Sequence, residues 1–140
     1  MVGAKYAVCQ QNVYIFGGEY QDILTGNMLP NKTLYRLSID IDQRTVEFIS
    51  LPSKPNNPCS RTNHSMTNIT DEYLVLVGGM SLPNNKMLRD IWLYDIILGD
   101  WVKIDPANGP LHPLSDNTLI LHKSSVMILG GLTDHQNMWN

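Results

Sequence analysis

Three pairs of adjacent glycines constrain the fold of this chain more than any other feature of its sequence. The pairs are Gly17-Gly18, Gly78-Gly79 and Gly130-Gly131, and they recur about every 50 to 60 residues. Each pair directly follows a short run rich in β-branched and aromatic residues: Val13–Phe16, Tyr73–Val77 and Val126–Leu129. Such runs are too short for a helix, and a run that ends at glycine is typical of a buried β-strand. The sequence therefore predicts a repeated β unit.

Further motifs recur at matching places in the units. After the second glycine pair, the segment Asp90–Asp95 contains Trp92 and Tyr94 and leads to Trp101. After the first pair, Thr33–Leu37 leads to Phe48 through an acidic residue. Ahead of the second and third pairs stand two polar segments, Arg61-x-x-His64 and Asp116–Thr118. Each unit reads as two strands, a glycine pair, a loop, a strand that ends near an aspartate, and an aromatic strand.

These motifs resemble the kelch repeat, and the resemblance covers essentially the whole chain. It rests on Gly78-Gly79, Trp92-x-Tyr94-Asp95, Trp101 and Arg61-x-x-His64. In that family a unit of about 50 residues forms one four-stranded blade of a β-propeller. The first unit departs from the pattern in having Phe48 for tryptophan, and the third has Asp116–Thr118 where the family's Arg and His would fall.

The resemblance implies an all-β fold, an incomplete kelch-type β-propeller of four-stranded antiparallel blades. We expect blades at residues 4–51 and 62–105 and a half blade at 116–131. The expected strands are Lys5–Gln10, Val13–Phe16, Thr33–Ser38, Thr45–Ser50, Asn63–Asn68, Tyr73–Val77, Asp90–Tyr94, Trp101–Ile104, Asn117–His122 and Ser125–Leu129.

The chain is too short to close a propeller ring by itself. Propellers have about four to eight blades, and a ring of six needs about 300 residues. The 140 residues supply about two and a half blades. Open blade edges invite association, so we expect either a fragment of a larger kelch-repeat protein or a unit that self-associates through those edges.

Composition excludes several classes of function. The net charge is −3, and charged residues make up 16% of the chain, which argues against nucleic-acid binding. No apolar run approaches the ~20 residues of a membrane helix. Two cysteines, Cys9 and Cys59, favour free thiols in a reducing, cytoplasmic compartment. The glycosylation triplets at Asn31, Asn63 and Asn68 leave an extracellular module as an alternative.

The sequence contains no recognisable catalytic, cofactor or metal constellation, so we predict no enzyme, no cofactor and no metal. His64 belongs to a structural motif, and we expect it to pack and to form hydrogen bonds within the fold. His112, His122 and His135 lack the spacing of zinc ligands. Some kelch-type propellers are copper oxidases or sugar-acid mutarotases, so the resemblance leaves part of such an enzyme as an alternative.

Two connecting loops are the candidate partner-binding segments. Glu19–Lys32 and Met80–Arg89 mix exposed-type apolar residues with polar ones, a composition typical of a peptide-binding rim, although such loops can also fold over their own blades. The candidate contact residues are Tyr20, Asp22, Met28, Leu29, Met80, Leu82, Lys86, Met87 and Arg89. The predicted function is a protein–protein interaction scaffold, and the resemblance implies actin or the substrates of ubiquitin-ligase adaptors as partners.

Overall fold

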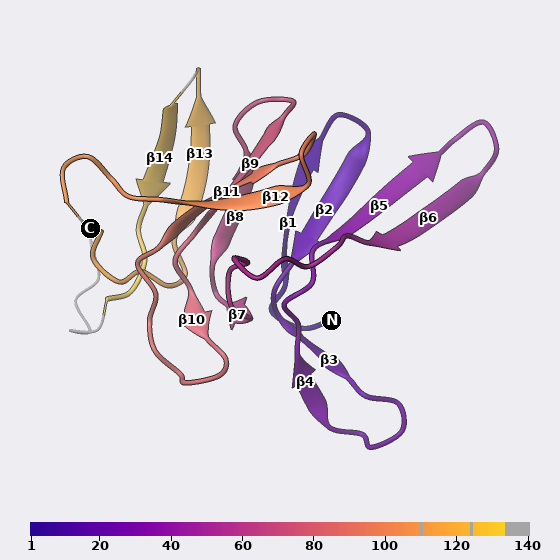
Figure 1. Cartoon of the computed structure of the whole chain (residues 1–140), viewed down its shortest axis with the longest axis horizontal. Helices are drawn as coiled ribbons and strands as arrows, with labels where there is room; N and C mark the ends of the chain where they lie inside the picture. Colours follow the sequence, from indigo (N-terminus) through magenta and orange to yellow (C-terminus); the bar gives the residue numbers. More distant parts are fainter. Residues whose placement is uncertain (110, 124, 134–140) are drawn as a thin grey trace.

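The computed structural model of this chain describes residues 1–109, 111–123 and 125–133, and the elements in that part of the chain are β-strands. Two four-stranded antiparallel sheets and a third, two-stranded sheet stand side by side (Figure 1). This is the all-β, partial-propeller architecture expected from the sequence, and we call the three sheets the first, second and third blades.

Each four-stranded blade follows the chain by simple hairpin steps, with one longer connection in its middle. The first blade has the order β1-β2-β5-β6 and the second the order β12-β11-β9-β8. The strands of the first blade are β1 (Lys5–Cys9), β2 (Asn12–Phe16), β5 (Tyr35–Asp40) and β6 (Thr45–Ser50). Those of the second blade are β8 (Ser65–Asn68), β9 (Tyr73–Val77), β11 (Ile91–Asp95) and β12 (Asp100–Ile104).

The third blade is the hairpin of β13 (Thr118–His122) and β14 (Ser125–Leu129). The first strands of the three blades are neighbours, because β1 lies against β8 and β8 lies against β13. Apolar residues therefore become buried where one blade faces the next.

The main core lies between the first and second blades. Its buried members are Ala7, Cys9, Tyr14, Phe16, Leu34, Met66, Leu74, Leu76, Tyr94 and Trp101. Trp101 on β12 joins the two sheets, because its ring lies 5.4 Å from the ring of Phe16 in the first blade and 5.1 Å from that of Tyr94 in its own blade. Aromatic packing of this kind adds to the area that it removes from water.

Sequence patterns missed four short strands. Every strand that we expected is present with its ends shifted by a residue or two. The segment Glu19–Lys32, expected to be a loop, contains a β-hairpin of β3 (Glu19–Gln21) and β4 (Met28–Pro30). A second small sheet pairs β7 (Arg61–Thr62) with β10 (Met80–Ser81). Strands of two or three residues are shorter than the window over which apolar alternation can be recognised.

Candidate functional site

The longer connections gather at one end of the blades, opposite the tight turns β1–β2, β5–β6 and β11–β12 (Figure 1). We call this end, which holds the β3–β4 hairpin, the β7–β10 sheet and the connection from β12 to β13, the loop end. Both candidate loops from the sequence lie here. Residues on loops that a rigid scaffold positions are the usual carriers of binding function.

The β3–β4 hairpin projects from the first blade and has an ordered tip (Figure 1). The Asp22 carboxylate accepts hydrogen bonds from the Thr25 hydroxyl at 2.6 Å and the Leu24 main-chain N–H at 3.3 Å. These two bonds, the one from Thr25 first, lower the pKa of Asp22. The turn that they fix exposes Ile23 and Leu24 to 97% and 94%. A predicted contact residue, Asp22, thus shapes the tip, and the apolar pair beside it forms the most exposed apolar feature of the hairpin.

The base of the hairpin is fixed as firmly as its tip. Val2 and Glu19 exchange two main-chain hydrogen bonds, at 2.8 and 2.9 Å. The buried Asn31 side chain donates to the carbonyls of Gly17 at 3.1 Å and Thr33 at 3.0 Å. The predicted contact residues between base and tip are exposed: Tyr20, Met28 and Leu29. The whole hairpin therefore presents its apolar side chains from a defined position.

The second candidate loop folds back on its own blade. Met80 forms an isolated bridge with Met87, and the main-chain N–H of Leu82 donates to the Ser60 carbonyl at 3.0 Å. Met80, Leu82 and Met87 are half-buried, whereas Lys86 and Arg89 are exposed. The structure thus separates the predicted residues of this loop into apolar side chains that cover the blade and cationic side chains that face solvent.

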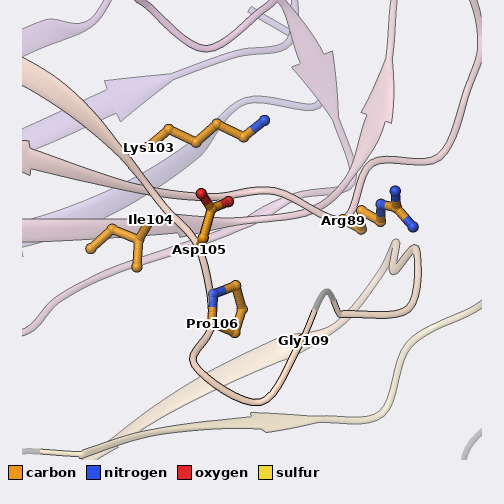
Figure 2. Close-up of a pocket in the computed structure, with 6 residues that line it drawn as sticks. All are labelled: Arg89, Lys103, Ile104, Asp105, Pro106 and Gly109. Carbon is orange, nitrogen blue, oxygen red and sulfur yellow. The ribbon is translucent and has the colours of Figure 1, made fainter.

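Arg89 lines a pocket of about 360 Å³ at the loop end (Figure 2). The other lining residues come from the end of β12 and the connection that follows it: Lys103, Ile104, Asp105, Pro106 and Gly109. In the part of the chain that the structure describes, the side chains of Arg89, Lys103 and Asp105 make no ion pair with each other or with another residue. Two cations beside one carboxylate leave this pocket with one net positive charge.

The Arg61-x-x-His64 motif lies inside the fold and not at the surface. The Arg61 guanidinium donates to both carboxylate oxygens of Asp90, at 2.6 and 2.9 Å, and to the Gly78 carbonyl at 3.0 Å. The Trp92 indole N–H also donates to Asp90, at 2.7 Å. Burial alone would raise the pKa of Asp90, but the bonds and charge of Arg61 lower it on balance. The motif thus fixes the loop end of the second blade from within.

His64 is fully buried and packs edge-on against Phe16, with 5.9 Å between the ring centroids. The hydrogen bonds expected for His64 are not found: within the described chain neither ring nitrogen has a partner. Burial, with the positive charges of Arg61 and Lys5, lowers the pKa of His64 to about 3. The Phe16 main chain opposes this shift only in part. His64 is therefore neutral at physiological pH.

The remaining candidate groups are dispersed. No three His, Cys, Asp or Glu residues lie together as a metal site among residues 1–109, 111–123 and 125–133. Cys9 and Cys59 are free thiols, and burial, followed by the charge of Asp71, raises the pKa of Cys9. His135 lies outside the described residues. The described part of the chain has no helix long and apolar enough to cross a membrane.

Comparison with known proteins matches this arrangement of blades to one family. The profile of the KLHDC2/KLHL20/DRC7 Kelch-repeats domain matches residues 2–139. The chain belongs to the kelch-repeat family. Kelch domain-containing protein 2 of Bos taurus is 26% identical over 128 residues, covering 87% of this chain and 27% of the relative. Kelch domain-containing protein 3 of Homo sapiens is 26% identical over 121 residues, covering 86% of this chain and 31% of the relative.

Solved structures support the same kelch fold. The structure of YjhT superimposes with a TM-score of 0.70 at 19% identity, covering 95% of this chain and 35% of that one. At this identity the likeness concerns the fold alone. The chain thus spans about a third or less of the length of these kelch proteins. Membership of the family supports a general role as a protein-interaction scaffold.

Proposed function

We propose that this kelch segment is a protein-interaction scaffold that contacts its partner through the β3–β4 hairpin at the loop end. The observation that carries the proposal is the pair Ile23 and Leu24, exposed to 97% and 94% on a tip that the Asp22 carboxylate holds in place. Two adjacent apolar side chains at such exposure gain free energy when a partner covers them. Because base and tip are ordered before binding, little conformational entropy is lost on contact.

The chemistry of the hairpin indicates the kind of partner. Tyr20 and Met28 flank the tip on β3 and β4, so the partner offers an apolar groove that receives a row of aliphatic and aromatic side chains. The pocket around Arg89 and Lys103 adds positive charge at the same end of the blades, which favours a partner with a carboxylate beside that groove.

Affinity capture with a matched pair of variants tests this proposal. The variant Ile23→Ser/Leu24→Ser removes the apolar tip. The control Ile97→Ser/Leu98→Ser changes an equally adjacent pair, exposed to 71% and 73%, in the β11–β12 turn at the opposite end. We expect partners captured by the unchanged chain and by the control to be lost with the hairpin variant. Equal capture by all three chains would show that the hairpin is not the contact.

The identity of the partner follows from the same captured set. Actin and a substrate of a ubiquitin-ligase adaptor are the partners that we propose from the kelch resemblance. Co-sedimentation with actin filaments tests the first. Dependence of the captured protein's ubiquitylation on Ile23 and Leu24 tests the second. No cluster in the described chain favours the copper-oxidase or mutarotase alternative, so we propose no catalytic role.

A reducing, cytoplasmic compartment is part of the proposal, and the free thiols Cys9 and Cys59 support it. The buried Asn31 side chain speaks against an extracellular module, because its amide is bonded within the fold and leaves no room for a glycan. Mass spectrometry of the chain from its native source tests the compartment. A glycan on Asn63 or Asn68 would contradict it.

A further inference from the structure

The joint between consecutive blades is built in the same way twice. The second glycine of Gly17-Gly18 donates its main-chain N–H to the Arg61 carbonyl at 2.8 Å. The second glycine of Gly78-Gly79 donates to the Leu114 carbonyl at 2.7 Å. The first glycine of each pair has a positive φ, and a Cβ there would lie 2.5 Å from the Arg61 oxygen or 2.3 Å from the Leu114 oxygen. Each pair is therefore a socket that receives one carbonyl from the next blade.

The third glycine pair is the same socket without an occupant among the described residues. Gly130 and Gly131 have φ values of 65° and 108°, within the range that the other pairs adopt. A Cβ built on Gly130 would meet nothing within 4 Å. Leu129, which directly precedes this pair, is 49% exposed, whereas Phe16 and Val77 at the two closed joints are buried. The joint after the third blade is thus open.

The first blade carries the matching plug. Arg61 and Leu114 each stand two residues before a non-glycine residue with positive φ, namely Asn63 and Asp116. In the first blade Gly3, with φ of 70°, holds that place, so Met1 corresponds to the two plug residues. The Met1 carbonyl accepts no hydrogen bond from the described chain.

The face of the first blade around this plug is also open. Phe48 pairs with Leu37 as Trp101 pairs with Tyr94, so the two aromatic residues hold the same place in successive blades. Trp101 is 4% exposed because the first blade covers it, whereas Phe48 is 53% exposed and stacks on Tyr35 of its own blade, 4.8 Å away. Register places further exposed apolar residues on this face: Tyr6, Val8, Ile39 and Val46.

The outward face of the third blade is apolar as well. Ile120 and Met127 are cross-strand partners, and Leu129 lies on the same face two residues beyond Met127. All three side chains are exposed. Contiguous exposed apolar faces of this kind mark interaction surfaces.

We propose that a second copy of this chain fills both openings, with the third blade of one copy docked on the first blade of the next. The two closed joints within the chain show what fits each open face, and a single chain carries both halves in the register that the closed joints use. Such a contact is heterologous, so assembly proceeds head to tail. The 35% coverage of the solved YjhT chain leaves space in a ring of that size for about two further copies. This contact is independent of the β3–β4 hairpin.

Two variants damage opposite halves of the joint. Gly130→Asn keeps a residue type that tolerates positive φ and places a side chain in the socket. Phe48→Asp places a charge on the face of the first blade. Gly99→Asn is the control for the first, because Gly99 has the same φ of 65° and only the Tyr94 hydroxyl within 4 Å. Ile97→Asp, in the same β11–β12 turn, is the control for the second.

Sedimentation velocity from about 1 to 200 μM, with circular dichroism of each variant, tests the proposal. We expect the unchanged chain and both controls to assemble with rising concentration, and each single variant to associate at least ten-fold more weakly. An equimolar mixture of Phe48→Asp and Gly130→Asn restores one intact joint, so it forms a heterodimer that does not extend. A monomeric unchanged chain over the whole range, or a mixture that stays monomeric, overturns the proposal.

Discussion

Lowering the pH from 7 to 5 will remove about 2 kcal/mol from the free energy of unfolding through His64 alone. The side chain is fully buried, and its two ring nitrogens have no hydrogen-bond partner in the described chain, so the protonated form has no compensation in the fold. Its pKa is about 3 in the folded chain, against an ordinary value of about 6.5 in the unfolded chain.

The sign follows from proton binding. Between pH 6.5 and about 3 the unfolded chain takes up a proton at His64 and the folded chain does not, so acid favours unfolding in that window. At pH 5 the unfolded chain gains about 2.1 kcal/mol from protonation and at pH 7 about 0.2, which leaves the difference of about 2. Any folded-state pKa below about 4 gives the same loss at pH 5. Asp90, whose pKa is lowered, loses its contribution only as the pH falls through its folded value, below this window.

Urea unfolding at pH 7, 6 and 5 measures the effect, at a concentration where the chain is monomeric. With a slope of about 1.5 kcal/mol per molar urea, the midpoint should fall by about 1.3 M between pH 7 and pH 5. The comparison variant is His64→Asn, which removes the titrating group and lowers stability at every pH. Its loss between pH 7 and 5 should be smaller than that of the unchanged chain by about 2 kcal/mol. Parallel losses in the two chains would refute the reasoning.

Three further predictions concern stability at neutral pH. Gly78→Ala should cost about 3 kcal/mol or more in urea unfolding, because a Cβ there lies 2.3 Å from a carbonyl, whereas Gly26→Ala, with the same sign of φ but nothing within 4 Å, should cost about 1; equal costs would show that the joint tolerates a side chain. Asp90→Asn should cost about 3 kcal/mol, because it leaves the Arg61 guanidinium buried without its counter-charge, and a loss below 1 kcal/mol would contradict a buried pair. Trp101→Ala should lower the free energy of unfolding by about 3 to 5 kcal/mol, because the ring fills the space between two blades, and an unchanged melting temperature would argue against that packing.

Local patterns were sufficient to predict the blade strands. Runs such as Tyr73–Val77 carry their signal within a few residues, and the glycine that follows each run marks its end. The kelch resemblance added the order of the strands, which register confirms in the pairing of β9 with β11 and of β11 with β12. The fold class could therefore be predicted before any tertiary contact was known.

The candidate site was predicted only in part. The two loops that hold Tyr20 and Arg89 could be chosen from composition, but the hairpin within Glu19–Lys32 was missed because its strands are only three residues long. The apolar pair Ile23 and Leu24 was also missed, although its place between Asp22 and a glycine within a polar segment was a signal that could have been used. The pocket beside Arg89 is formed by segments that meet only in the folded chain.

The sequence by itself determined which residues form strands, where the glycine pairs stand and which family the chain resembles, because these depend on neighbours within a few positions or on a repeated spacing. Only the tertiary structure decided which of the repeated positions are buried. Phe48 and Trp101 occupy the same place in their units, yet one is exposed and the other is enclosed. The physical reason is that a blade face is buried by whatever packs against it, and that neighbour is not encoded in the unit itself.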